Sequence, residues 1–159
     1  MGKGGILLLA FVHTAVALTC PNGWTVNQNS CYHVSRDRES WVEATRMCEL
    51  HGGYLAHIET AEEQTFMKQL LQRVNDHQYW LGGSDWTIEG KWIWEPRGVA
   101  FNFTSWSHGE PDNRHNEQHC LLLDTHSHNQ WFDHDCNDAR HYICENSEGV
   151  ESTDPDLVG

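Results

Sequence analysis

Six cysteines constrain what this chain can fold into more than any other feature of its sequence. All six follow an apolar N-terminal run, and their number is even. In an oxidising compartment, such a set predicts a framework of disulfides, not a zinc or redox site. The spacing alone does not choose among the possible pairings. We therefore expect a disulfide-stabilised domain whose connectivity is still open at this point.

The N-terminal segment, residues 1–19, has the pattern of a secretory signal peptide. A lysine precedes the apolar run Ile6–Val12, and Ala15–Ala17 offers a small-residue cleavage site. The apolar run is too short to cross a bilayer of about 30 Å as a helix, so a membrane anchor is the less favoured alternative. We expect a secreted, extracellular protein without membrane insertion.

Residues 20–145 are expected to form one domain. Their number suits a single core, and eight tryptophans in the chain can fill it. The remaining residues, 146–159, are acidic, include a proline and lack aromatic side chains, which predicts a disordered tail. The formal net charge of −13 argues against nucleic acid as a partner, because phosphate binding requires a basic face. The negative charge is instead typical of a surface that binds cations or that keeps the protein in solution.

Two helices and several strands are predicted in an α+β order. Ser40 and Thr60 each open a capping-box pattern that is followed by apolar residues at helical spacing. Alternating or aromatic-rich runs predict strands at Cys31–Val34, Tyr79–Gly83, Lys91–Trp94, Cys120–Leu123, Gln130–Phe132 and His141–Cys144. Residues 96–119 show no clear period. A loop of that length inside a compact domain is usually functional.

The stretch from His108 to Cys136 concentrates acidic side chains around a proline. Calcium takes about 6 to 8 oxygen ligands, and carboxylates are well suited to supply them. The acidic candidates are Glu110, Asp112, Glu117 and Asp133. Such a cluster would repel itself without an ion, so we expect a cation site here.

Several motifs in this order resemble the C-type lectin family. Glu110-Pro111-Asp112 and Trp131-Phe132-Asp133 are similar to the Glu-Pro-Asn or Gln-Pro-Asp and Trp-Asn-Asp motifs of the family's sugar-binding calcium site. Tyr79–Gly82 is similar to its Trp-Ile-Gly-Leu core motif. The resemblance covers Cys20 to Glu145 and extends to small secreted members such as the mollusc perlucin-like lectins. It implies a C-type lectin-like domain with two helices, small antiparallel sheets, a long calcium- and sugar-binding loop and three disulfides, which pair Cys20 with Cys31, Cys48 with Cys144 and Cys120 with Cys136.

The same resemblance implies how calcium and sugar would be held. A cis peptide before Pro111 would turn its flanking side chains toward one ion, whose remaining positions are taken by two sugar hydroxyls. The implied ligands of both calcium and sugar are Glu110, Asp112 and Asp133. For a further ligand, Gln118 offers an amide oxygen, whereas Glu117 reaches the ion only if the loop is reshaped. Phe132 replaces the family's asparagine, which removes one ligand and predicts weaker calcium binding.

Sugar choice depends on the same loop. Asp112 matches the family's galactose-type motif at its position, which favours galactose or N-acetylgalactosamine over mannose-type sugars. Trp106 or Phe132 could stack on the apolar face of the sugar, although core packing is the commoner role of such side chains.

A second metal site is also implied by the resemblance. Asp85 and Glu89 match an acidic pair that forms an auxiliary calcium site in some family members. The other positions of that site here carry Asn113 and His119.

The loop histidines suggest a zinc site or acid-sensitive ligand release, because imidazole suits Zn²⁺ better than calcium and titrates near neutral pH. Solvated histidines are the alternative. They are His108, His115, His119, His126, His128, His134 and His141.

Asn102 begins a glycosylation sequon, Asn102-Phe103-Thr104, in the predicted loop. In a secreted chain this position is a candidate for an attached glycan.

The expected function is calcium-dependent recognition of glycans on microbes or cell surfaces, without catalysis. One shallow site binds weakly, so a homo-oligomer or a multivalent target would supply avidity. The alternative is a lectin-fold protein that has lost sugar binding and serves as a protein-binding or mineral-associated matrix component, which Phe132 and Gln118 favour. Hydrolysis by the acidic loop is the least favoured hypothesis.

Overall fold

A branched sheet of nine strands organises the residues that the computed structural model describes, 19–74 and 76–147. Its main path runs β1-β2-β9-β4-β5-β6, with β3 paired to β9, β7 to β4 and β8 to β7. Outside the described residues lie 1–18 of the predicted signal peptide (1–19) and 148–159 of the predicted tail (146–159). Asn146, the first residue of the predicted tail, instead ends β9. The strands are β1 (Thr25–Asn27), β2 (Ser30–Val34), β3 (Tyr54–Leu55), β4 (Gln78–Ser84), β5 (Ile93–Trp94), β6 (Val99–Ala100), β7 (Gln118–Asp124), β8 (Gln130–Asp135) and β9 (His141–Asn146).

The strand pairings are antiparallel with one exception. Strands β4 and β9 run parallel, with Tyr79 opposite His141 and Trp80 opposite Tyr142. The prediction of small antiparallel sheets is therefore right for the other pairs but missed this one. The hairpin of β7 and β8 separates β4 from β9 in sequence, and such long-range partnering leaves no local signal.

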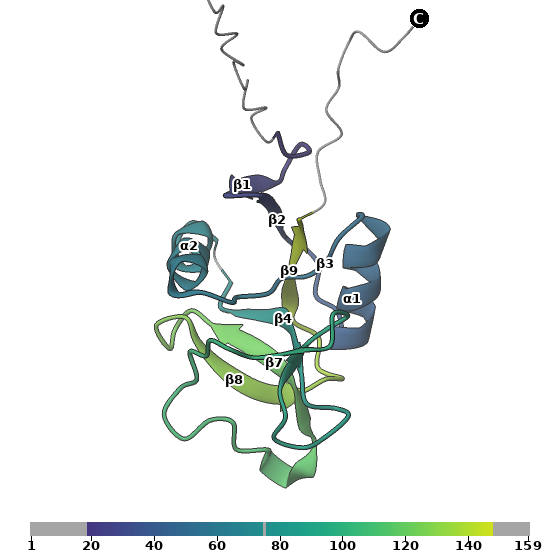
Figure 1. Cartoon of the computed structure of the whole chain (residues 1–159), viewed down its shortest axis with the longest axis vertical. Coiled ribbons are helices and arrows are strands. Elements are labelled where there is room, and N and C mark those ends of the chain that lie inside the picture. The colour runs from purple at the N-terminus through teal and green to yellow at the C-terminus, as the bar shows by residue number, and fades with distance from the viewer. Residues whose placement is uncertain (1–18, 75, 148–159) are drawn as a thin grey trace, which may run out of the picture.

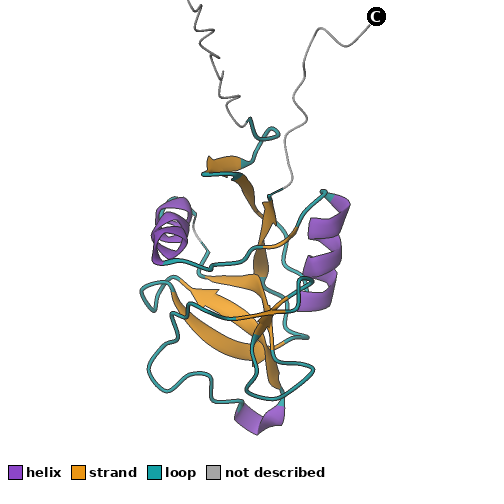
Figure 2. Cartoon of the chain, in the orientation of Figure 1, coloured by secondary structure: helices purple, strands orange, loops and turns teal. Residues whose placement is uncertain are grey.

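Two helices flank the sheet on opposite sides (Figure 1, Figure 2). They are α1 (Trp41–Leu50) and α2 (Ala61–Leu71). The Ser40 hydroxyl accepts a hydrogen bond from the Glu43 amide at 3.3 Å, which caps α1. At α2 the capping box is complete, because Thr60 Oγ1 accepts from Glu63 N and the Glu63 carboxylate accepts from Thr60 N, both at 3.1 Å. Both predicted helices are confirmed.

Three disulfides form in the pairing that the family resemblance implied: Cys20 with Cys31, Cys48 with Cys144 and Cys120 with Cys136. The second ties α1 to β9, and the third ties the start of β7 to the end of β8. Tryptophans fill the core as expected, since Trp80, Trp94 and Trp131 are fully buried.

Residues 101–117 form the long loop that connects β6 to β7, at the end of the molecule opposite β1 (Figure 1). The loop contains one short 3₁₀ helix, η1 (Arg114–Asn116). It is attached to the core near Trp106, because Ser107 N donates to Trp131 O at 2.9 Å and Trp131 N donates to Ser105 O at 2.8 Å. Neither helix of the described chain is long and apolar enough to cross a membrane.

Candidate functional site

Three carboxylates converge where the long loop meets β8. Glu110 and Asp112 come from the loop and Asp133 from the strand, and their oxygen atoms lie within 4.8 Å of one another. Asp133 is only 2% exposed, whereas Asp112 faces solvent. We call this group the loop cluster. It brings together three of the residues that the sequence predicted as calcium and sugar ligands.

Hydrogen bonds to Asp133 fix the shape of the loop cluster. Its Oδ1 accepts from the Asp112 amide at 3.1 Å and its Oδ2 accepts from the Asn113 amide at 2.7 Å. The peptide bond between Glu110 and Pro111 is cis, as expected. The strand carboxylate therefore holds the two loop residues beside it, with a turn in the backbone between them.

The loop cluster is electrostatically crowded. Partial burial, the contact with Asp133 and the charge of Asp112 together raise the pKa of Glu110 from 4.5 to about 7. Arg114 opposes this, since its Nε lies 2.8 Å from Asp112 Oδ2. A group of carboxylates in this arrangement is better accommodated with a cation among them, and all of its donors are the hard oxygens that calcium prefers.

The structure separates the two candidates for a further ligand. Gln118 borders the same hollow as the loop cluster, but its side chain is engaged: Oε1 accepts from Arg114 N at 2.6 Å and Nε2 donates to Asp133 O at 3.2 Å. Glu117 is exposed and borders a different hollow, beside Trp86 and His119. Gln118 therefore lies with the loop cluster and Glu117 lies apart from it.

The two aromatic candidates also occupy different places. Phe132 is half-buried and forms an apolar wall of the hollow that contains the loop cluster. Trp106 packs into the core, with its ring 4.9 Å from that of Trp92 and 5.8 Å from that of Trp131. Trp106 is thus positioned to anchor the loop, and Phe132 is the aromatic ring at the carboxylates.

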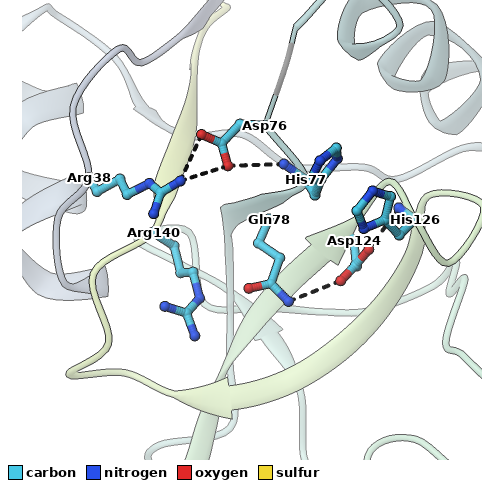
Figure 3. Close-up of a pocket in the computed structure, with 7 residues that line it drawn as sticks. All are labelled: Arg38, Asp76, His77, Gln78, Asp124, His126 and Arg140. Atoms are coloured by element: carbon cyan, nitrogen blue, oxygen red, sulfur yellow. Dashed lines mark hydrogen bonds and ion pairs between the residues drawn. The ribbon is translucent and has the colours of Figure 1, made fainter.

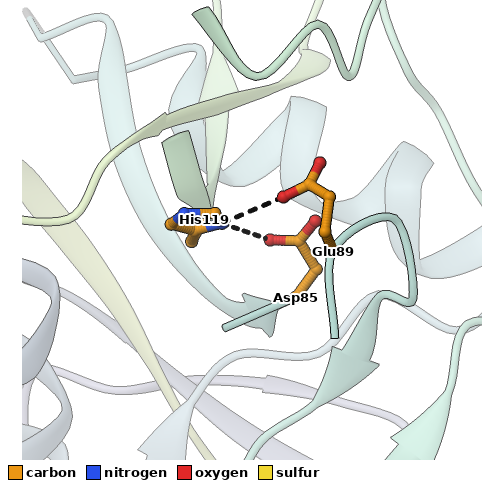
Figure 4. A group of neighbouring side chains, drawn as sticks. All are labelled: Asp85, Glu89 and His119. Atoms are coloured by element: carbon orange, nitrogen blue, oxygen red, sulfur yellow. Dashed lines mark hydrogen bonds and ion pairs between the residues drawn. The ribbon is translucent and has the colours of Figure 1, made fainter. Parts of the chain in front are cut away.

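A second group, the histidine cluster, lies at the end of β4 and the start of β7 (Figure 4). His119 Nδ1 is 3.0 Å from Asp85 Oδ1 and 3.4 Å from Glu89 Oε2. The sequence paired Asp85 with Glu89 and treated His119 as a departure from the calcium pattern. The structure places all three side chains together.

The other loop histidines are dispersed. His126 stacks on His77 with ring centroids 3.5 Å apart, in a hollow that also contains Arg38 and Asp76 (Figure 3). The rest contact acids elsewhere or face solvent: His134 contacts Asp138, His141 contacts Asp76, and His108, His115 and His128 are exposed. Among the described residues, His119 is the histidine that shares a group with two carboxylates.

Two residues beside the loop cluster have contacts that the sequence did not predict. Arg114 forms the ion pair with Asp112, and Asn113 Oδ1 accepts from the Gln118 amide at 3.0 Å. An arginine two residues after an acid is a common surface pattern, so the sequence carried no signal for its role. Asn113 has a φ of 40°, a left-handed conformation that asparagine tolerates better than most residues, which offers a weak signal.

Comparisons with known proteins identify the family. The Lectin C-type domain model matches residues 37–146. The chain belongs to the C-type lectin domain family. It is 39% identical to perlucin of Haliotis laevigata over 128 residues, which cover 79% of this chain and 82% of perlucin.

Solved C-type lectin structures share the fold. The carbohydrate-recognition domain of the mouse scavenger receptor C-type lectin matches with a TM-score of 0.74 and 30% identity, over 83% of this chain and all of that domain. A calcium-independent type II antifreeze protein matches with a TM-score of 0.74 and 27% identity, over 82% of this chain and 96% of its own. C-type lectin domains generally bind calcium and carbohydrate, and the antifreeze protein demonstrates that the fold also exists in a calcium-independent form.

Proposed function

We propose that this chain is a secreted protein that binds carbohydrate through a calcium ion at the loop cluster. The observation that carries the proposal is the convergence of Glu110, Asp112 and Asp133, with their oxygens within 4.8 Å of one another, beside an open hollow. An ion at this place has protein oxygens on one side and the hollow on the other. A sugar in that hollow can complete the shell of about 6 to 8 oxygens that calcium requires.

Each residue of the loop cluster has a distinct part in this proposal. Asp133 is the buried ligand and also holds the loop through two backbone amides. Glu110 and Asp112 contact both ion and sugar, and as carboxylates they only accept hydrogen bonds, so the bound hydroxyls must donate to them. Phe132 supplies an apolar wall against which a sugar face can pack.

The proposed preference is for galactose or N-acetylgalactosamine over mannose-type sugars, because Asp112 matches the galactose-type motif. The proposed targets are glycans of microbial or cell surfaces. A single open site gives weak binding, so a homo-oligomer or a multivalent glycan would be needed for avidity. Asn102 is exposed in the long loop and is the proposed glycosylation position. We propose no catalytic role for the acids.

Affinity chromatography tests this proposal. The mature protein is applied to immobilised galactose and to immobilised mannose in calcium, and each resin is then washed with a chelator. The expected result is retention on galactose and elution by the chelator. Binding to neither resin, or binding that survives the chelator, would contradict a calcium-bridged sugar site.

A second candidate function has specific observations in its favour. Phe132 places an apolar ring where the family pattern has an amide, and Arg114 already pairs with Asp112 at 2.8 Å. The calcium-independent antifreeze protein is a precedent for this fold without the ion. The alternative is therefore a lectin-fold protein that binds a protein or a mineral in a matrix. It predicts binding that free monosaccharide does not inhibit.

A further inference from the structure

The histidine cluster has a donor set unlike that of the loop cluster. One imidazole nitrogen, His119 Nδ1, lies 3.0 Å from Asp85 Oδ1 and 3.4 Å from Glu89 Oε2 (Figure 4). Asp85 is only 2% exposed, whereas the Glu89 side chain is 57% exposed. A buried acid, a half-buried histidine and an exposed acid thus point to one place from three positions.

The backbone holds two of these side chains in register. Asp85 N donates to His119 O at 3.2 Å, so the end of β4 and the start of β7 are joined at the two residues themselves. Asp85 Oδ2 accepts from Gly90 N at 2.8 Å, which closes the turn that carries Glu89. The next residue along β7, Cys120, is fixed by its disulfide to Cys136. Two of the three members, Asp85 and His119, are therefore held by the backbone, and Glu89 is carried by the adjoining turn.

One side of the histidine cluster is open. A hollow next to His119 is bordered by polar side chains and by Trp86, which is 63% exposed and meets the His119 ring edge-on at 5.7 Å. The polar side chains are Asn116, Glu117, Asp135 and Asn137. Solvent therefore reaches His119 from this hollow, and it reaches the exposed side chain of Glu89 as well.

We propose that Asp85, Glu89 and His119 bind a zinc-class divalent ion. Imidazole in the tautomer that carries its proton on Nε2 presents a lone pair at Nδ1, toward both carboxylates. Three protein ligands of nitrogen and oxygen with a fourth position open to solvent are a common arrangement for Zn²⁺. Calcium takes only oxygen and needs more ligands, so a nitrogen in place of an oxygen disfavours it.

The charge of the cluster agrees with a doubly charged ion. Two carboxylates and a neutral imidazole carry a formal charge of −2, which one Zn²⁺ balances. For Asp85, which is nearly inaccessible to water, such a balance offsets the cost of burying its charge. Glu117 borders the open hollow and would add negative potential at the entrance.

Zinc binding to the whole chain, without a histidine tag, tests this proposal by isothermal titration in the absence of sugar. His119→Asp replaces the nitrogen donor with oxygen and should weaken zinc binding by at least about tenfold, since even indirect changes at metal sites cost that much. Glu89→Gln should also weaken it, and this exposed residue leaves the core untouched. His126→Ala, outside the cluster, should leave zinc affinity unchanged.

Trp86 provides an independent readout. Zinc at His119 should change the tryptophan fluorescence of the wild type, and Trp86→Phe should remove that change while the zinc stoichiometry stays the same. Equal zinc affinity in the wild type, His119→Asp and Glu89→Gln would overturn the proposal, as would a loss confined to His126→Ala. Asp133→Asn removes one charged ligand of the loop cluster without touching this one, so failure of the sugar site is distinguished from failure of the zinc site.

Discussion

The loop cluster and the histidine cluster both gather acids near the start of β7, yet they differ in donors and in support. The loop cluster is made of oxygens alone and depends on Asp133 to hold a loop in place. The histidine cluster includes a nitrogen, and a backbone hydrogen bond joins Asp85, just after β4, to His119 in β7. On the two proposals made above, an imidazole among carboxylates would be enough to change which ion a site prefers.

Removing the loop anchor should produce the largest effect. Asp133→Asn is expected to weaken calcium binding by roughly a hundredfold or more, because it removes a charged ligand and also one acceptor of the loop amides. Calcium titration calorimetry measures this, and zinc titration of the same variant is the control. An unchanged calcium isotherm would show that Asp133 is not a calcium ligand and would contradict a calcium site at the loop cluster.

An amide at position 132, where the family pattern has asparagine, should strengthen calcium binding at the loop cluster. Phe132→Asn adds an oxygen ligand beside Asp133 and is expected to tighten calcium binding by roughly tenfold, since calcium affinity follows ligand number. Phe132→Leu, which supplies no oxygen, is the matched control. Equal calcium affinity in both variants would show that the side chain at this position does not reach the ion.

The pH dependence of the metal-free protein tests the crowding of the loop cluster. The pKa of Glu110 is about 7 in the folded chain against an ordinary 4.5. The contribution of protonated Glu110 to the free energy of unfolding is therefore fully present below pH 4.5, and it is lost as the pH rises through 7. In a chelator, Glu110→Gln should melt increasingly above the wild type across this window. In saturating calcium the order should reverse, because only the wild type keeps a charged ligand at this position.

A constant difference in melting temperature between Glu110→Gln and the wild type, at every pH, would contradict this assignment. It would mean that the substitution acts through packing and not through the charge of the carboxylate.

The smallest effect is expected from the exposed arginine of the loop cluster. Arg114→Ala releases Asp112 from its ion pair and should tighten calcium binding by up to about fivefold, since exposed pairs contribute at most about 1 kcal/mol. High salt should erase the difference, because it screens the pair in the wild type as well. A gain that persists in high salt would point to a rearranged loop.

The fold was largely predictable because its signals are local. The capping residues Ser40 and Thr60 predicted the starts of the two helices, and alternating or aromatic-rich runs predicted most of the strands. The short strands β1, β3 and β6 were not predicted, since each has only two or three residues and is defined by its partner. The disulfide pairing came from the family resemblance, not from the spacing of the cysteines.

The sequence predicted which acids of the loop cluster would lie together, but not where the neighbouring candidates would lie. Glu110, Asp112 and Asp133 were expected together, and the structure brings them together. Glu117 lies apart because the loop reverses through His115 and Asn116, whose φ values of 60° and 58° no residue pattern had indicated. Likewise, His119 joins Asp85 only through a strand pairing that is remote in sequence.

The most direct test of the account is calcium titration in the presence and absence of sugar. If one ion at the loop cluster is shared between protein and sugar, then saturating galactose must raise the apparent calcium affinity, and calcium must raise galactose affinity by the same factor. Mannose should do so less. The account predicts this coupling in the wild type and its loss in Asp133→Asn. A calcium affinity that neither sugar changes would contradict it.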